Sequence, residues 1–332
     1  MLLQGAVKPR QARVTRIFYP ADVATIIFLT LLAGLAAAFP ARVPMWPAVV
    51  ASSAAIVAAL SAIAVADARF DTRASRFLHG WAFAGFAYAI YAEVHWVAGP
   101  IHGGWLADDA LIAIDRAMFG ANPIDAFGAI ARPWLTEAAQ VAYTLFYPLA
   151  VCVGAELYAR RPAEDFHRYS FACAYVFLAS YVGYILVPAV GPRFTLYDFT
   201  GIERDLPGLL LTQPLRHFVD AGGLVPQGVP AAVAQSLAHR DVFPSGHTMM
   251  TLAAVWWSWR MRLAVRWLVT PVGAVLVFAT MYLRYHYVID VVAGAALAAA
   301  AIATLPAAWR CVVSRLPTRP CDEPALARRA GQ

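Results

Sequence analysis

The sequence has little charge for its length. Only 14% of its 332 residues are Asp, Glu, Lys or Arg, while 61% are apolar and the mean hydropathy is +0.60. In soluble globular chains, roughly a quarter of the residues are charged. The apolar stretches also occupy most of the chain and leave no room for a separate soluble domain. We therefore expect an integral membrane protein made of a single membrane domain.

Lysine is almost absent. Lys8 is the only lysine among 26 basic residues, so arginine carries nearly all of the positive charge behind the formal net charge of +6. The arginines stand in short clusters between apolar runs and do not form one basic face of the kind that binds nucleic acid. We expect no nucleic-acid partner and interpret the clusters as topology signals.

Cysteine is scarce as well. The positions of the cysteines predict neither a disulfide framework nor a metal site, because their spacing matches no metal-ligand motif. The four cysteines are Cys152, Cys173, Cys311 and Cys321. Glu93, His95 and His102, with Asp108 and Asp109 nearby, are candidates for a metal site, but their irregular spacing forms no known ligand motif. We therefore expect neither a metal nor another cofactor.

Eight apolar runs are bounded by charged residues, proline or tryptophan, and a membrane-spanning helix needs about 20 residues. They cover residues 20–39, 46–66, 77–98, 137–158, 167–189, 243–259, 263–283 and 286–308. The pattern predicts an all-α, polytopic transmembrane helix bundle with about eight spans.

Arginine clusters follow the second, fourth, sixth and eighth runs, and Lys8, Arg10, Arg13 and Arg16 precede the first. Basic residues accumulate on the cytoplasmic side of membrane proteins. Both termini are therefore expected in the cytoplasm, with the protein in the inner or plasma membrane. The connections expected on the periplasmic or extracellular side are residues 40–45, 99–136, 190–242 and the turn near residue 284.

Two of these outer connections are unusually long. Structureless connections beyond about 15 residues are uncommon and are usually functional. The apolar and acidic residues of segment 105–119 predict a short amphipathic helix that lies in the membrane interface. A second short helix is predicted over residues 207–219.

The segment Phe243-Pro244-Ser245-Gly246-His247-Thr248 opens the sixth run. Ser245 is a good N-cap, and the first helical turn behind it offers unpaired N–H groups to an anion. Gly246 allows an anion to approach the backbone, and His247 places a titratable ring beside it. By itself the segment is explained equally well as an ordinary helix start.

A histidine and an aspartate stand four residues apart at the entrance to the eighth run, in Arg284-Tyr285-His286-Tyr287-Val288-Ile289-Asp290. On a helix they share a face, and Asp290 would lean back toward the imidazole. A carboxylate there would orient the ring and leave its other nitrogen free as a nucleophile. An ionisable residue is costly to place inside an apolar span, so the position of Asp290 also suggests a functional role.

Arg193 follows the fifth run in Gly191-Pro192-Arg193. Its planar guanidinium suits phosphate oxygens, and the predicted topology places it on the same outer side as both histidines. A single arginine at a span end is more often a residue of the membrane interface. Arg193 is therefore a candidate for phosphate binding only together with the two histidine motifs.

The fourth run carries a polar stripe. Thr136, Gln140, Tyr143 and Tyr147 fall at i, i+4, i+7 and i+11, on one helix face that is expected to turn toward protein. Gln140, Tyr143 and Tyr147 are candidates for head-group binding. Helix–helix packing explains each of them equally well.

Together these elements resemble the type 2 phosphatidic acid phosphatase superfamily. Pro-Ser-Gly-His at 244–247 matches its second motif, and His286 with Asp290 matches the His-x-x-x-Asp of its third. The resemblance implies a six-helix catalytic core over residues 137–308, N-terminal spans and an outer interfacial loop over 1–136, and a cytoplasmic tail over 309–332. It further implies that His286 attacks phosphorus to form a phosphohistidine, that Asp290 orients it, and that His247 protonates the leaving group. Ser245 and Gly246 would hold the phosphate.

The first motif of that superfamily pairs a lysine with a downstream Arg-Pro, whereas this sequence has no lysine there and has Gly-Pro-Arg. Thr280 stands six residues before His286, where the third motif usually has an arginine, and Arg284 stands two before instead. Arg193 and Arg284 are therefore both candidates for phosphate binding. These features are similar to the inositol phosphorylceramide synthase-like branch, as is the Gly294 that follows the third motif.

Members of that branch transfer a phospho-head-group between lipids, so the resemblance implies a metal-independent lipid phosphotransferase. Its partners would be a phosphorylated lipid and an alcohol acceptor, while water as acceptor would make it a lipid phosphate phosphatase. A transporter would need polar residues near mid-membrane on several spans. A non-catalytic scaffold would leave the histidines without a role, and vanadate-dependent peroxidases are disfavoured by the membrane spans. The sequence indicates neither the acceptor nor the oligomeric state.

Overall fold

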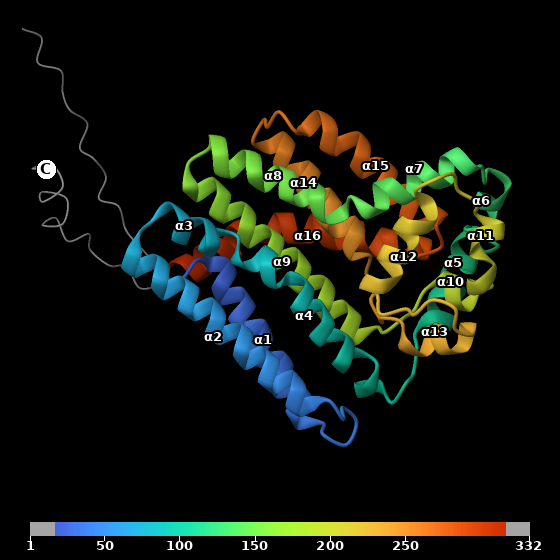
Figure 1. The fold of residues 1–332 in the computed structure, drawn as a ribbon, viewed down its shortest axis with the longest axis horizontal. Coiled ribbons are helices and arrows are strands. Elements are labelled where there is room, and N and C mark those ends of the chain that lie inside the picture. Colours follow the sequence, from blue (N-terminus) through green and yellow to red (C-terminus); the bar gives the residue numbers. More distant parts are fainter. Residues whose placement is uncertain (1–16, 317–332) are drawn as a thin grey trace, which may run out of the picture.

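The computed structural model describes residues 17–316 as long helices that run together and carry short helices at one end (Figure 1). No β-strand occurs within these residues. The expected all-helical bundle is therefore confirmed. The basic cluster from Lys8 to Arg16, the cysteine at 321 and most of the tail predicted over 309–332 lie outside the described residues.

Each predicted run corresponds to a long helix or a pair of helices. They are α1 (Pro20–Ala38), α2 (Trp46–Phe70), α4 (Ala82–Ala98), the pair α7 (Pro133–Thr144) and α8 (Phe146–Arg160), α9 (Ala163–Leu186), α14 (Gly246–Arg260), α15 (Arg266–Tyr282) and α16 (Val288–Val313). By length and composition α1, α2, α9 and α16 can cross a membrane, and α7 with α8 makes a fifth span if the bent pair is counted as one. Helices α4, α14 and α15 have only 17, 15 and 17 residues. The total of eight spans therefore stays a prediction.

The fourth predicted span is not one straight helix. Helices α7 and α8 meet at Leu145, and their axes differ by 51°. Pro148 lies four residues after Thr144. A proline ring clashes with the carbonyl four residues earlier and removes a hydrogen-bond donor, so the chain bends there. The polar stripe expected along a single helix is thus divided between two helices.

Most of the two long outer connections is helical. Their short elements are η1 (Pro100–His102), α5 (Asp108–Phe119), α6 (Asp125–Ala129), α10 (Pro192–Thr195), η2 (Phe199–Gly201), α11 (Ile202–Asp205), α12 (Thr212–Gly222) and α13 (Ala231–Leu237). Helices α5 and α12 confirm the two short helices predicted near residues 105–119 and 207–219. Whether α5 lies in a membrane interface stays a prediction.

Two aspartate side chains of helix α5 are buried against the rest of the protein. Asp108 accepts hydrogen bonds from the Gly191 N–H and the Tyr287 hydroxyl, both at 2.8 Å. Asp115 accepts from the first two N–H groups of α16, at 2.9 and 2.8 Å. These N–H groups have no partner within their own helix. Helix α5 therefore fixes the start of α16 and the loop at residue 191.

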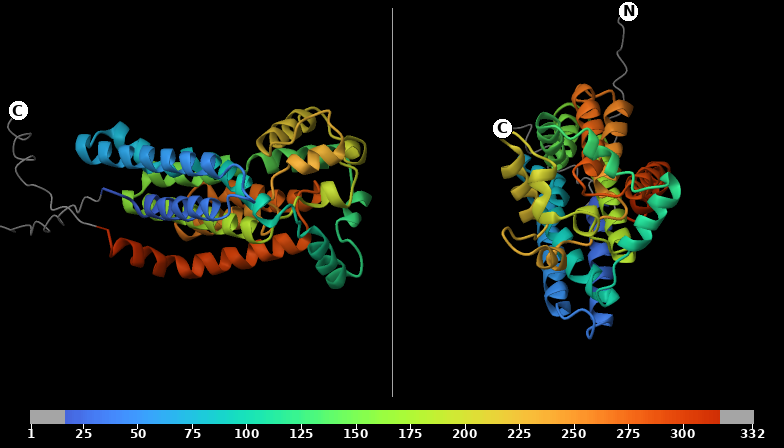
Figure 2. Two further views of the ribbon diagram at one scale, coloured as in Figure 1. Left: turned by 90° about the horizontal axis from the view of Figure 1, so that it is seen from below. Right: turned by 90° about the vertical axis from the view of Figure 1, so that its right-hand side faces the viewer.

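The arginine-rich connections lie together. Helices α2, α8, α14 and α16 all end at the end of the bundle opposite the short helices α10 to α13 (Figures 1 and 2). The arginine clusters follow these four helices in the sequence. This arrangement agrees with the alternation from which the predicted topology was drawn.

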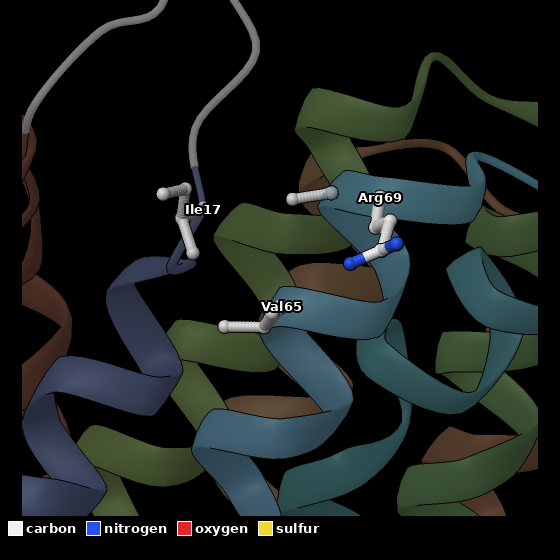
Figure 3. Close-up of a pocket in the computed structure, with 4 residues that line it drawn as sticks. Ile17, Val65 and Arg69 are labelled. Carbon is white, nitrogen blue, oxygen red and sulfur yellow. The ribbon is translucent and has the colours of Figure 1, made fainter.

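Two features mark that arginine-rich end. A hollow of about 310 Å³ lies between the start of α1 and the end of α2, lined by Ile17, Val65, Ala68 and Arg69 (Figure 3). Its lining contains no nucleophile and no acid–base pair, so it offers no catalytic chemistry. Nearby, α3 (Arg73–Gly80) contributes the buried His79, which joins α1 and α2 through their carboxylates.

Candidate functional site

One large cavity, of about 750 Å³, contains both histidines that the sequence singles out. Residues from α4, α8, α9, α12 and the start of α14 line it, together with the loop before α16. The cavity has a polar region around His247 and His286 and an apolar region that extends to Trp81 and Phe166.

The rings of His247 and His286 lie close together although 38 residues separate them in the chain. Their centroids are 5.6 Å apart and their planes differ by 64°. His247 is packed between Tyr143, at 4.5 Å, and Phe146, at 4.3 Å between ring centroids. Both imidazoles can therefore contact one tetrahedral anion placed between them.

His286 is oriented by the backbone of Val242. Its Nδ1 lies 2.9 Å from the Val242 carbonyl oxygen. A carbonyl can only accept, so Nδ1 carries the proton and Nε2 keeps its lone pair. Burial lowers the pKa of His286 to about 4, although the charge of Asp241 and the bond to Val242 act in the opposite direction. The ring is therefore neutral at physiological pH and has the form that a nucleophile needs.

Asp290 lies next to His286 but does not hydrogen-bond its ring. Its Oδ2 is 3.6 Å from Nδ1 of His286 and accepts the N–H of Tyr287 at 2.7 Å. Asp290 is thus at the third position of α16 and caps the start of this helix through the N–H of Tyr287. Its carbonyl also accepts the Ser245 N–H at 3.0 Å, which ties the start of α14 to α16.

The start of α14 points its first turn into the cavity. Gly246 and His247 line the cavity. Ser245 is the N-cap: its hydroxyl oxygen accepts the Thr248 N–H at 3.3 Å and the Thr248 hydroxyl at 3.0 Å. A Cβ on Gly246 would lie 2.2 Å from the Tyr184 hydroxyl, so any other residue would require the Tyr184 side chain to shift. Ser245 is fully buried and is not part of the cavity wall.

Arg193 lines the cavity. Its guanidinium pairs with Asp220 of α12 at 2.5 Å and lies over the rings of Phe194 and Tyr285, at 4.6 and 4.7 Å. Gly191 has a φ of 94°, and a Cβ there would lie 2.6 Å from the Tyr285 carbonyl. The glycine in Gly-Pro-Arg therefore allows this loop to pack against the loop that contains His286.

Arg284 is held away from the cavity. Its guanidinium pairs with Asp205 at 2.9 Å and lies 3.8 Å from the centre of the Tyr197 ring. It is not among the residues that line the cavity. Of the two candidate arginines, the fold brings only Arg193 beside the histidines.

The polar residues of α7 and α8 have different positions. Tyr143 and Tyr147 line the cavity. Gln140 is fully buried outside the cavity wall, and its side-chain amide has no hydrogen-bond partner within residues 17–316. Thr136 bonds the Tyr282 hydroxyl at 2.8 Å and so contributes to helix packing.

The residues considered for a metal site are dispersed. Glu93 accepts a hydrogen bond from Ser53, and His102 bonds the Ile185 carbonyl. His95 stacks on His239 at 4.2 Å. Across the part of the chain that the structure describes, no group of three or more His, Cys, Asp or Glu side chains is placed to hold a metal ion.

Sequence reasoning missed several residues around the site. Asp241 lines the cavity one residue before Val242, and Asp220 balances the charge of Arg193 from another helix. Neither belongs to a local motif. Asp108 and Asp115 could have been found from the sequence, because two acidic residues seven positions apart lie on the same face of a predicted helix.

The site contains the parts that displacement at phosphorus needs. A neutral imidazole with a free nitrogen can attack, a second imidazole can move a proton, and a guanidinium with the first turn of α14 can stabilise negative charge.

Comparison with known proteins agrees with this geometry. The family model of the PAP2 superfamily matches residues 109–304, from α5 to α16. The matched region begins before residue 137, where the core was predicted to start, and includes Asp115 of α5, which holds the start of α16. No curated protein and no solved structure gives a match. Because the matched region is more than half of the chain, this protein belongs to the PAP2 superfamily, and this membership supports an enzyme that acts on lipid-like phosphates.

Proposed function

We propose that the protein is a membrane lipid phosphotransferase that works through a phosphohistidine on His286 and needs no metal ion. Membership of the PAP2 superfamily supports phosphatase- or phosphotransferase-type chemistry in general. The observation that carries the proposal is the 5.6 Å separation of the His247 and His286 rings in one cavity that Arg193 also lines.

In the first step, Nε2 of His286 attacks phosphorus, and the bond between phosphorus and the leaving alcohol oxygen breaks. His247 reacts in its protonated form, which the negative charge of a bound phosphate favours; it gives that proton to the oxygen, which leaves as a neutral alcohol. Arg193 and the N–H groups at the start of α14 stabilise the charge on the other phosphate oxygens, and Gly246 allows their close approach. Ser245 supports this turn as its N-cap, and Asp290 stabilises the His286 loop.

In the second step, an acceptor hydroxyl gives its proton to His247 and attacks phosphorus, and the bond to Nε2 of His286 breaks. A lipid alcohol as acceptor makes the protein a transferase. The similarity of the Gly-Pro-Arg and His-Tyr-x-x-Asp patterns to the inositol phosphorylceramide synthase-like branch favours this outcome. Water as acceptor would make it a lipid phosphate phosphatase.

The shape of the cavity supports a lipid as substrate. Beyond the histidines its wall is formed by apolar side chains of α4, α8 and α9 and ends near Trp81 and Gly154. An acyl chain can bury its surface there at roughly 0.8 kcal/mol per methylene. Tyr143, whose ring centroid lies 4.5 Å from that of His247, and Tyr147 line the same cavity, where they can contact the head group.

The decisive experiment is a transfer assay with the purified protein. Phospholipids are incubated with a labelled lipid alcohol, and both free phosphate and head-group exchange are measured. His286→Ala is expected to lower turnover by at least about 10³-fold without unfolding the protein. His217→Ala, which changes an exposed histidine of α12, serves as control. Turnover retained in His286→Ala would refute the nucleophile.

Two further measurements test the metal independence of the reaction and the orientation of the protein in the membrane. A metal chelator is expected to leave turnover unchanged. We also propose that the termini are cytoplasmic and that the cavity opens on the outer side. An Asp109→Cys variant without the native cysteines should then react with a membrane-impermeant thiol reagent in intact cells, whereas Arg160→Cys should not.

A further inference from the structure

The wall of the cavity has one basic and one acidic side chain. Among residues 17–316, Arg193 and Asp241 are the only Asp, Glu, Lys or Arg side chains that line it. Arg193 already has a partner in Asp220. Asp241 accepts a hydrogen bond from the Tyr91 hydroxyl at 2.5 Å. The charge of the neighbouring Arg240 interacts with that of Asp241, but no cationic side chain within residues 17–316 lies close enough to form an ion pair with it. A partly buried carboxylate without an ion-pair partner is costly, so a cation from a ligand would stabilise it.

Several aromatic rings lie near this carboxylate. Tyr91 stacks on His239 at 4.2 Å between centroids, and Tyr88 lies 6.1 Å from Tyr91. Tyr147 lines the same cavity. Burial and the nearby Arg240 lower the pKa of His239 to about 3, so this ring is neutral and does not balance the charge of Asp241. Aromatic faces together with a carboxylate form the usual environment for an alkylated or primary ammonium group.

Asp241 also lies beside the nucleophile. It precedes Val242, whose carbonyl holds His286 at 2.9 Å. The charges of Asp241 and Arg193 act on the pKa of His286 in opposite directions, so both side chains are within electrostatic reach of the ring. A phosphate at His286 would therefore have one positive and one negative side chain near it.

We propose that Asp241 and the aromatic rings beside it bind the ammonium of an amine-bearing head group, so that the donor lipid is a zwitterionic phosphodiester of the phosphatidylethanolamine or phosphatidylcholine class. The inference rests on the proposed function. His286 attacks phosphorus, the bond to the diacylglycerol oxygen breaks, and that oxygen takes the proton of His247. The phosphorylated amino alcohol stays on His286 until an acceptor hydroxyl displaces it.

A sugar or glycerol head group is the main rival. Its hydroxyls can donate to Asp241, but a neutral polyol brings no cation into contact with the carboxylate and makes no use of the aromatic faces. A phosphomonoester places no group at all beside Asp241. The ammonium is the ligand that satisfies both the carboxylate and the rings.

The test compares donors with identical acyl chains: phosphatidylethanolamine, phosphatidylcholine, phosphatidylinositol, phosphatidylglycerol and phosphatidic acid. Release of labelled diacylglycerol gives kcat/KM for each donor. The wild-type protein is expected to prefer the two amine-bearing donors. Asp241→Asn should lower the ratio of kcat/KM for amine-bearing donors to that for phosphatidylglycerol by about ten-fold or more. Asp109→Asn, which changes an exposed carboxylate of α5, should not alter the ratio.

A measurement on the wild-type protein keeps the proposal testable if Asp241→Asn does not fold. An alkylphosphocholine should inhibit turnover at a concentration about ten-fold lower than an alkyl phosphoglycerol of the same chain length. A preference for inositol or glycerol donors, or an unchanged donor ratio in folded Asp241→Asn, overturns the amine subsite but leaves the phosphohistidine mechanism. Turnover that survives in His286→Ala overturns the proposed function itself.

Discussion

His286 donates the proton on Nδ1 to the backbone carbonyl of Val242 at 2.9 Å, a residue 44 positions earlier in the chain. The bond leaves Nε2 of His286 free of this partner, and the ring lies in the cavity wall with its centroid 5.6 Å from that of His247. The segment that contains Val242 leads directly into the N-cap of α14. The position of the proposed nucleophile is therefore coupled to the position of the anion-binding helix turn.

Two substitutions of Asp290 separate its charge from its capping bond. Asp290→Ala removes the acceptor for the Tyr287 N–H and should destabilise the protein by about 1 kcal/mol. Asp290→Asn can keep that acceptor and should cost less stability, but it replaces the carboxyl group whose Oδ2 lies 3.6 Å from Nδ1 of His286. We expect kcat to fall by about 10- to 100-fold in Asp290→Asn if Asp290 becomes a carboxylate and stabilises the imidazolium during the reaction. Full activity in Asp290→Asn would restrict Asp290 to capping.

The acid side of the pH profile should report His286. Because burial lowers its pKa to about 4, the ring stays neutral well below the ordinary value of 6.5. The kcat/KM for a phosphodiester, whose phosphate keeps one charge over this range, should therefore fall on the acid side only as the pH approaches 4. Loss of kcat/KM already near pH 6.5 would contradict the assignment, provided that circular dichroism shows the fold intact.

The apolar part of the cavity should determine the response to acyl-chain length. Ala150 lines this region on α8, so Ala150→Trp places a large ring where a chain is expected. Turnover of long-chain lipids should fall by about ten-fold or more, as expected from the loss of several buried methylenes, while lipids with short chains are affected less. Ala299→Trp, on an exposed position of α16, is the matched control. An equal effect on all chain lengths would indicate a general disturbance of the fold.

His79 should make stability depend on pH at the other end of the bundle. Its Nε2 is 2.8 Å from an Asp22 oxygen and its Nδ1 is 2.9 Å from an Asp67 oxygen. Burial alone would lower the pKa of His79, but the hydrogen bonds and charges of the two aspartates raise it above 6.5. Both nitrogens donate only when the ring is protonated.

A raised pKa means that the folded chain holds this proton more tightly than the unfolded chain. The stability that His79 contributes is complete below about pH 6.5 and is lost as the pH rises through the folded pKa. The thermal midpoint of the purified protein should therefore decrease from pH 6 toward alkaline pH. His79→Gln should lower the midpoint at pH 6 and flatten this decrease. A wild-type midpoint that rises over the same range would show that another group controls it.

Much of the fold follows from local features of the sequence. The long apolar runs produce helices because a backbone in an apolar environment must satisfy its own hydrogen bonds. Ser245 and Asp290 stand at the starts of helices for the same reason that such residues cap helices elsewhere. The break in the fourth run was also present in the sequence, at Pro148, but the length of the run concealed it.

The relations between segments were decided by tertiary packing. The sequence determined that His247 lies in the first turn of one helix and His286 just before another, and only packing brought their rings to 5.6 Å. Packing also turned Arg284 toward Asp205, paired Arg193 with Asp220 and placed Asp241 in the cavity wall. The physical reason is the range of the interactions. Caps and apolar periodicity act over a few residues and can be read along the chain, whereas a charge takes its partner from whichever helix lies beside it after folding.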